Sequence, residues 1–163
     1  MLDVEVIKED GSKHYLAVND AVVARGQLSK TIDLHLSLDG DEISKYRADG
    51  LLFATPTGST AYSLSAGGPI LAPKMECILM TPVCPHSLFS RSVLFSGESE
   101  LSVHVKIPEE CCCVLTIDGE KNVPVLATDR VVIRKSDLKL KLALLHNRNF
   151  YKLLNEKLKE RDF

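Results

Sequence analysis

The chain has 163 residues, with 20 Lys and Arg against 22 Asp and Glu, so its net charge at pH 7 is only -2. This length suffices for one hydrophobic core without disulfide bonds, and the balanced charge argues against nucleic acid or an anionic membrane as the main partner. No apolar run is long enough to cross a bilayer, and residues 1–5 have neither the basic flank nor the apolar core of a secretory signal. We therefore expect a globular, cytoplasmic protein.

Short strands are predicted along most of the chain. Alternation of apolar and polar residues is clearest at 32–38 and 138–142, which is typical of strands with one buried and one solvated face. Further strands are expected at 4–7, 15–23, 51–54, 77–80, 101–107, 113–117 and 131–134. Asp-Gly pairs at 10–11, 39–40 and 118–119 predict tight hairpins between strands, because both central residues of such turns need positive φ. The strands should therefore pair antiparallel.

Two segments are predicted to be helical. The first is short, follows Gly58, and ends before the helix-breaking sequence Gly-Gly-Pro at 67–69. The second covers residues 149–161, where apolar residues fall on one face at helical spacing, and we expect it to dock on the sheet or on a neighbouring molecule. Those apolar residues are Phe150, Leu153, Leu154 and Leu158. Because the helical crossovers of a parallel sheet are missing, the sequence predicts a mainly β, two-sheet β-sandwich-like domain with these two helices.

The five cysteines are an odd number, and three of them are consecutive at 111–113. This arrangement suits neither a secreted disulfide framework nor the paired Cys-x-x-Cys ligands of a zinc site. We interpret the cysteines as small apolar residues of a reduced strand, and we predict no metal site within this chain.

Residues 49–69 carry the most chemical information. They read as a buried strand, a loop rich in hydroxyl groups and the start of a helix, with Gly58 allowing close approach of a ligand to the backbone. Natural helix-capping residues in this loop are Thr57, Ser59 and Thr60. The spacing is not that of a phosphate-binding P-loop, since no Lys follows the glycine. Two interpretations stay open on this basis: a ligand-binding corner, and a plain capped turn between strand and helix.

The same segment resembles the signature of the NAD kinase family. In that family an Asp-Gly pair and an apolar strand precede the sequence Thr-Pro-Thr-Gly-Ser-Thr-Ala-Tyr, which occupies 55–62 of this chain and is followed by Gly-Gly-Pro. The resemblance continues at 19–26, at Thr-Pro-Val-Cys-Pro-His-Ser-Leu with the following Arg91, and at the Asp-Gly-Glu of 118–120. The order and spacing of these motifs agree over essentially the whole chain.

The resemblance implies an enzyme that transfers the γ-phosphoryl group of ATP, or in some members of polyphosphate, to the 2′-hydroxyl of the adenosine ribose of NAD, giving NADP. It also implies a two-part architecture, in which residues 1–163 are the C-terminal NAD-binding and oligomerisation domain and an N-terminal α/β kinase domain is absent. The expected assembly is a homodimer or homotetramer. The expected ligands are NAD or NADP here, with ATP and a divalent metal ion such as Mg²⁺ in the full enzyme.

By the same resemblance, the NAD-binding residues are Asn19, Asp20, Lys30, Arg47, Asp49, Thr60, Ala61, Tyr62, Ser63, Leu64, Ser65 and Glu120. Asn19 and Asp20 are expected to meet ribose hydroxyls or base edges, and Lys30 and Arg47 to match phosphate charge. Asp20 stands where the family usually has Glu, and Glu120 replaces the usual Gln, which exchanges a donor for an acceptor.

Structural interpretations remain beside these roles. Asp49 before Gly50 fits a turn residue, and Asn19-Asp20 fits a bulge in a strand with solvated side chains. His86 looks catalytic at first sight, but no carboxylate or nucleophile is near it in the sequence, so we interpret it as a loop residue.

The family's Gly-Gly-Asp-Gly-Thr motif, whose aspartate activates the ribose hydroxyl, does not occur in the chain. We therefore expect no catalytic residue here and predict that the isolated chain is inactive, since phosphoryl transfer needs positioned phosphates, a metal ion and an oriented nucleophile. The alternative is a free-standing, non-catalytic domain that binds a dinucleotide or acts as a scaffold. A carbohydrate-binding β-sandwich is disfavoured because the chain has no Trp.

Overall fold

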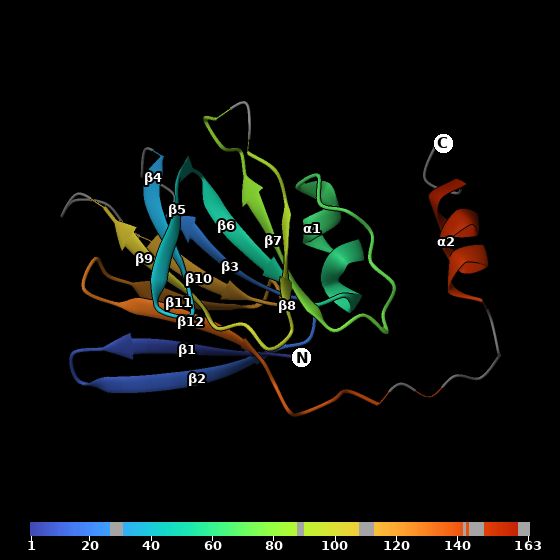
Figure 1. The fold of residues 1–163 in the computed structure, drawn as a ribbon, viewed down its shortest axis with the longest axis horizontal. Helices are drawn as coiled ribbons and strands as arrows, with labels where there is room; N and C mark the ends of the chain where they lie inside the picture. Colours follow the sequence, from blue (N-terminus) through green and yellow to red (C-terminus); the bar gives the residue numbers. More distant parts are fainter. Residues whose placement is uncertain (27–30, 88–89, 108–112, 142, 144–148, 160–163) are drawn as a thin grey trace.

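The computed structural model describes residues 1–26, 31–87, 90–107, 113–141, 143 and 149–159, and Figure 1 shows two β-sheets with short helices beside them. The first sheet contains, in spatial order, β2 (Gly11–Ala17), β1 (Leu2–Lys8), β12 (Arg130–Lys135), β9 (Leu101–Lys106), β4 (Ile32–Leu38) and β5 (Asp41–Ala48). The second sheet contains β11 (Lys121–Val125), β10 (Cys113–Ile117), β3 (Asp20–Arg25), β6 (Gly50–Ala54), β7 (Cys77–Val83) and β8 (Val93–Ser96). All neighbouring strands are antiparallel, so the predicted mainly β, two-sheet fold is confirmed.

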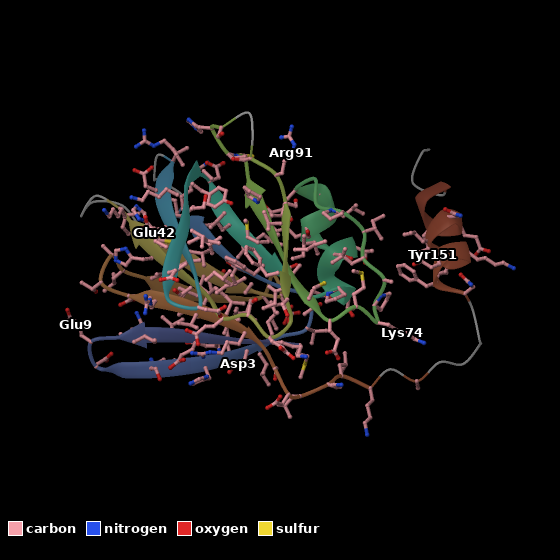
Figure 2. The ribbon with its side chains drawn as sticks, viewed as in Figure 1. Asp3, Glu9, Glu42, Lys74, Arg91 and Tyr151 are labelled. Carbon is pink, nitrogen blue, oxygen red and sulfur yellow. The ribbon has the colours of Figure 1, made fainter. Side chains whose placement is uncertain are left out.

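The hydrophobic core lies between the two sheets, and Figure 2 shows how densely side chains fill this region. On β1 every second residue from Leu2 is buried, as expected for a strand with one face on the core. In contrast, β6 is buried on both faces, since its other face meets a second apolar cluster that includes Leu71 and Leu79. The end of this fully enclosed strand leads directly into the hydroxyl-rich loop.

Two of the three predicted Asp-Gly hairpins have the expected turn. Asp39 and Asp118 have φ of 50° and 51°, and each is followed by a glycine with positive φ, as such turns require. At the first hairpin the pairing of Lys8 with Gly11 places Glu9 and Asp10 in the turn instead.

The predicted strand at 15–23 is two strands that belong to different sheets. It breaks at Val18 and Asn19, where the chain crosses from β2 in the first sheet to β3 in the second. Apolar residues flank the crossing on both sides, and the polar pair Asn19-Asp20 is the interruption that marks the break.

Three strands that the sequence analysis did not predict all lie at sheet edges. They are β5 in the first sheet, and β8 and β11 in the second. Edge strands are largely exposed, and β11 carries Pro124, which an inner strand would not tolerate. Their side chains therefore lack the strong apolar alternation on which strand prediction depends.

The prediction of a strand at 138–142 is wrong for residues 138–141, which have no strand pairing. Both neighbouring positions beside β12 are already occupied by β1 and β9, so a continuation of the chain has no open edge there. Leu138 and Leu140 are each more than half exposed. Residue 142 lies outside the described part of the chain.

The first predicted helical segment is confirmed, and the second is confirmed for residues 150–159, because 160 and 161 lie outside the described residues. A 3-10 helix, η1 (Thr57–Thr60), and the one-turn helix α1 (Tyr62–Ser65) follow β6, and α2 (Phe150–Lys159) forms the tail. Figure 1 shows α2 apart from both sheets, so it does not dock on them, and Figure 2 shows Tyr151 on this separate helix. Docking on a neighbour stays a prediction.

No helix within the described ranges is long and apolar enough to cross a membrane.

Candidate functional site

A cleft of about 640 Å³ lies on the outer face of the second sheet, on the side away from the core. Its lining comes from β3 and the residues beside it, the residue before β6, the end of β7, the start of α1, and the end of β10 with the turn that follows it. The lining residues are Asn19, Asp20, Val22, Ala24, Arg25, Gly26, Asp49, Ala61, Tyr62, Val83, Cys84, Thr116, Asp118 and Gly119. Five residues predicted from the sequence are thus brought together from three distant parts of the chain.

The backbone of the crossing segment forms one wall of the cleft. Val18, Asn19 and Asp20 donate their N–H groups to the carboxylate of Asp118 over 2.8, 2.7 and 3.0 Å. On the opposite side, Thr55 donates its hydroxyl to the Val18 carbonyl over 2.7 Å and its N–H to the Asn19 carbonyl over 2.9 Å. The crossing is therefore a fixed segment and not a solvated bulge.

Asp20 is the most enclosed charged group of the cleft, with 4% of its surface exposed. Burial raises the pKa of its carboxyl, and the nearby Asp118 raises it further, whereas a hydrogen bond from the backbone N–H of Tyr62 opposes both effects. Asp20 thus connects β3 to the start of α1. A carboxylate in such a place is stabilised when a ligand brings hydrogen-bond donors or positive charge.

Asp49 is held by Arg25, a residue that the sequence analysis did not select. The guanidinium Nε of Arg25 donates to Asp49 Oδ1 over 2.7 Å, and its backbone N–H donates to the Asp49 carbonyl over 2.9 Å. The carboxylate raises the pKa of Arg25 through this hydrogen bond and the added Coulomb attraction. The location of Arg25 within the family-like segment 19–26 was a signal that could have identified it.

The hydroxyl groups of the hydroxyl-rich loop mainly form hydrogen bonds within the protein. Ser59 donates to the Pro56 carbonyl over 2.6 Å and accepts the N–H of Leu71 over 3.0 Å. The buried Ser63 hydroxyl lies 3.2 Å from that of Thr81, and the exposed Thr60 hydroxyl donates to the Thr57 carbonyl over 3.3 Å.

Only Ala61 and Tyr62 from this part of the chain line the cleft. The ring of Tyr62, with 48% of the residue exposed, offers a flat apolar surface to a ligand. The predicted capping residues Thr57, Ser59 and Thr60 do not cap a helix, because neither η1 nor α1 has a side-chain hydrogen bond at its N-cap. The hydroxyls of Ser59 and Thr60 bind nearby backbone carbonyls instead, and the ligand-binding interpretation stays a prediction.

The other predicted residues lie outside the cleft lining. Arg47 forms an ion pair with Asp33, with 2.8 Å between Nε and Oδ1, on the outer face of the first sheet. Glu120 is exposed in the turn directly after Gly119. Leu64 and Ser65 belong to α1, and Lys30 lies outside the described residues.

The cleft combines three carboxylates with one guanidinium, which is already bound to a carboxylate. Such a site offers acceptors for hydroxyl and amino groups, a ring for stacking and little free positive charge. It suits the nucleoside part of a ligand better than a phosphate group. No group of three or more metal-ligating side chains is found in the part of the chain that the structure describes.

The described cysteines lie on or beside strands of the second sheet. Cys77, Cys84 and Cys113 are free, and burial raises the pKa of the Cys113 thiol to about 12, so it stays protonated. Cys84 lines the cleft with φ of 46°. Cys111 and Cys112 lie outside the described residues.

Known proteins with similar sequences identify the family of this chain. The family model of the ATP-NAD kinase C-terminal domain matches residues 18–145, which include every lining residue of the cleft. The chain belongs to the NAD kinase family. The resemblance seen in the sequence is thereby confirmed.

Individual NAD kinases match nearly the whole chain. NAD kinase of Magnetococcus marinus is 42% identical over 161 residues, which cover 97% of this chain and 52% of the relative. NAD kinase of Lachnoclostridium phytofermentans is 38% identical over 163 residues, which cover 96% of this chain and 57% of the relative. The chain therefore spans about half the length of these relatives.

Solved structures extend the agreement to three dimensions. Yeast NADH kinase complexed with NADH superposes with a TM-score of 0.83 at 28% identity, covering 99% of this chain and 50% of the kinase. An NAD kinase from Archaeoglobus fulgidus in complex with ATP gives a TM-score of 0.69 at 30% identity, covering 84% of this chain and 51% of that one.

Proposed function

We propose that this chain is the dinucleotide-binding C-terminal domain of an NAD kinase and that NAD occupies the cleft on the second sheet. The observation that carries the proposal is the convergence of Asn19, Asp20, Asp49, Ala61 and Tyr62 on one cleft. These residues belong to separate family-like motifs of the sequence. A purely structural role for the motifs would not require their side chains to share an open cavity.

The chemistry of the lining suggests how NAD is held. The amide of Asn19 and the carboxylate of Asp20 suit ribose hydroxyls or the amino edge of a base, and the ring of Tyr62 suits stacking on a base. Asp49 offers a further acceptor whose direction is fixed by Arg25. Arg47, Thr60, Ser63, Leu64, Ser65 and Glu120 remain proposed contacts with less geometric support, because none of these six lines the cleft. Lys30, which lies outside the described residues, also remains a proposed contact.

For the parent enzyme we propose ATP-dependent phosphorylation of the 2′-hydroxyl of the adenosine ribose of NAD. The relatives are about twice as long as this chain, which favours a kinase with a further N-terminal domain over a free-standing, non-catalytic domain. ATP, a divalent ion such as Mg²⁺ and the catalytic aspartate are assigned to that other domain. The isolated chain is expected to form no NADP.

The same proposal includes a homodimer or homotetramer and a cytoplasmic location, where NAD and ATP are both available. Asp49 and Tyr62 are partly exposed at the mouth of the cleft, so a neighbouring subunit could approach them without a change of fold. Light scattering of the purified chain measures this assembly directly.

The binding proposal is tested by isothermal titration of NAD into the purified chain and into a Tyr62→Ala, Asp49→Ala double variant. We expect saturable binding by the wild type and a loss of at least about 100-fold in affinity by the variant, since stacking and a charged acceptor are both removed. A matched control, Tyr151→Ala with Asp41→Ala, removes the same two residue types from exposed positions outside the cleft. Equal loss in both double variants, or no binding by a folded wild type, contradicts the proposal.

A further inference from the structure

Asp118 occupies an unusual place among the carboxylates of the cleft, because its two oxygens are directed at backbone amides. Oδ1 accepts the N–H groups of Asn19 and Asp20, and Oδ2 accepts that of Val18. The backbone N–H of Asp118 returns a hydrogen bond to the Asp20 carbonyl over 2.9 Å. One residue of the β10–β11 turn therefore binds three consecutive peptide units that lie about 100 positions earlier in the chain.

The segment bound by Asp118 is the only covalent link between β2 and β3, and it has no partner strand at Val18 and Asn19. Without the carboxylate, three amides in a partly buried place would have no acceptor within the protein, which is unfavourable. Thr55 satisfies the carbonyls on the other side, and Gly58 approaches so closely that any side chain there would overlap the Asn19 carbonyl. The orientation of Asn19 and Asp20 is thus determined from both sides.

Asp39 shows that this arrangement is not a general property of an Asp-Gly turn. It also starts a two-residue Asp-Gly turn and also has positive φ, but its carboxylate accepts a single amide, that of Glu100, over 2.9 Å. The extra two amides bound by Asp118 are therefore a feature of the cleft. They also compensate for placing a second negative charge near the buried Asp20.

We propose that Asp118 is a positioning residue for the dinucleotide: it fixes the peptide units 18–20 and thereby directs the side chains of Asn19 and Asp20 into the cleft. The inference rests on the proposed function. Asp118 also lines the cleft, but three backbone N–H groups occupy most of its acceptor capacity, so its proposed role is to position Asn19 and Asp20.

The first test compares Asp118→Asn with Asp39→Asn. Asn tolerates positive φ, so each turn is preserved, but at position 118 the amide NH₂ would face a backbone N–H that now has an acceptor. We expect Asp118→Asn to weaken NAD binding about tenfold or more, and Asp39→Asn to change it by less than about twofold. A thermal melt of each variant establishes that both are folded.

Amide hydrogen exchange followed by NMR provides a readout that a general loss of stability would not reproduce. In Asp118→Asn, the amides of Val18, Asn19 and Asp20 should exchange faster, while amides of the inner strand β6 keep their protection. Uniform acceleration over the whole second sheet would show a structural role only and would overturn the inference.

A double-mutant cycle tests whether Asp118 acts through Asn19. If it does, adding Asp118→Asn to an Asn19→Ala chain should weaken NAD binding by a clearly smaller factor than it does in the wild type. Equal factors in both backgrounds contradict the inference.

The two hypotheses fail differently. A wild-type chain that does not bind NAD overturns the proposed function and, with it, the role of Asp118. A wild type that binds NAD, with unchanged binding by Asp118→Asn, overturns the inference alone.

Discussion

The outer faces of the two sheets use their polar residues in opposite ways. On the first sheet, charges are exposed and paired with each other, as in Asp33 with Arg47 and Glu5 with Arg134, and Figure 2 shows Glu42 on this sheet at β5. On the second sheet, charged side chains line a cleft together with apolar ones, and Asp20 is almost fully buried. The first face thus resembles an ordinary solvated surface, whereas the second holds a charge at a cost in stability that a ligand can offset.

The strongest test of this contrast is Gly58→Ala, at the glycine that packs against the backbone of Asn19. A Cβ there would overlap the backbone of Asn19, which cannot move without breaking its bonds to Thr55 and Asp118. We expect the free energy of unfolding to fall by about 3 kcal/mol and NAD binding to be lost, measured by denaturant unfolding and titration.

Gly40→Asn is the matched control for that substitution. Gly40 has open space around it and lies in a turn of the first sheet, and its φ of 95° is one that Asn adopts more readily than most residues. The substitution still carries backbone strain at this φ, so the free energy of unfolding should fall by about 1 kcal/mol, clearly less than for Gly58→Ala. A similar loss in both variants would mean that the cleft is no more constrained than a surface turn.

A smaller effect, with opposite signs for stability and binding, is expected from Asp20→Asn. The pKa of Asp20 is higher in the folded than in the unfolded chain, so the ionised carboxylate lowers the free energy of unfolding above both pKa values. This penalty disappears as the pH falls below both. The variant should therefore be more stable than the wild type at about pH 7.5, with a smaller difference near about pH 4, while it binds NAD more weakly.

Asp33→Asn, on the first sheet, should show the reverse dependence on pH. The hydrogen bond from Arg47 lowers the pKa of Asp33, so its contribution to stability is present above the unfolded pKa and lost as the pH falls through the folded one. Urea unfolding of both variants over this pH range compares the two faces directly. If the effects of both substitutions on the free energy of unfolding changed with pH in the same direction, the proposed difference between the two faces would be wrong.

The smallest effect is expected from Arg134→Ala, which removes ion pairs to Glu5 and Glu100 on the first sheet. Because these groups are partly solvated, the free energy of unfolding should fall by only about 1 kcal/mol at neutral pH. The loss should decrease at acid pH, since Arg134 lowers the pKa of Glu5 through its hydrogen bond. NAD affinity should not change, and a clear change would link the first sheet to the site.

The inner strands and the family could be predicted from the sequence because both depend on local signals. β4, β6 and β10 alternate or are continuously apolar, and the motif of residues 55–62 is contiguous. The edge strands β5, β8 and β11 could not be predicted, since an exposed edge imposes few requirements on its side chains. The Leu-Lys alternation predicted a strand at 138–142, but residues 138–141 form none. An alternating segment pairs only where a sheet edge is open to it, and the sequence pattern does not show whether one is.

For the site, the sequence by itself determined which residue types are present and where the cleft-forming motifs begin. Only the tertiary structure decided which of them face the cleft: Ala61 and Tyr62 line it, whereas Thr60 and Ser63 bind neighbouring protein groups. Arg25 and Asp118 lie within family-like motifs, but only the pairing of strands distant in the chain decided that they bind Asp49 and residues 18–20. Hydrogen bonds between a turn and a segment about 100 residues away depend on the pairing of β10 with β3 within the second sheet, which no local pattern encodes.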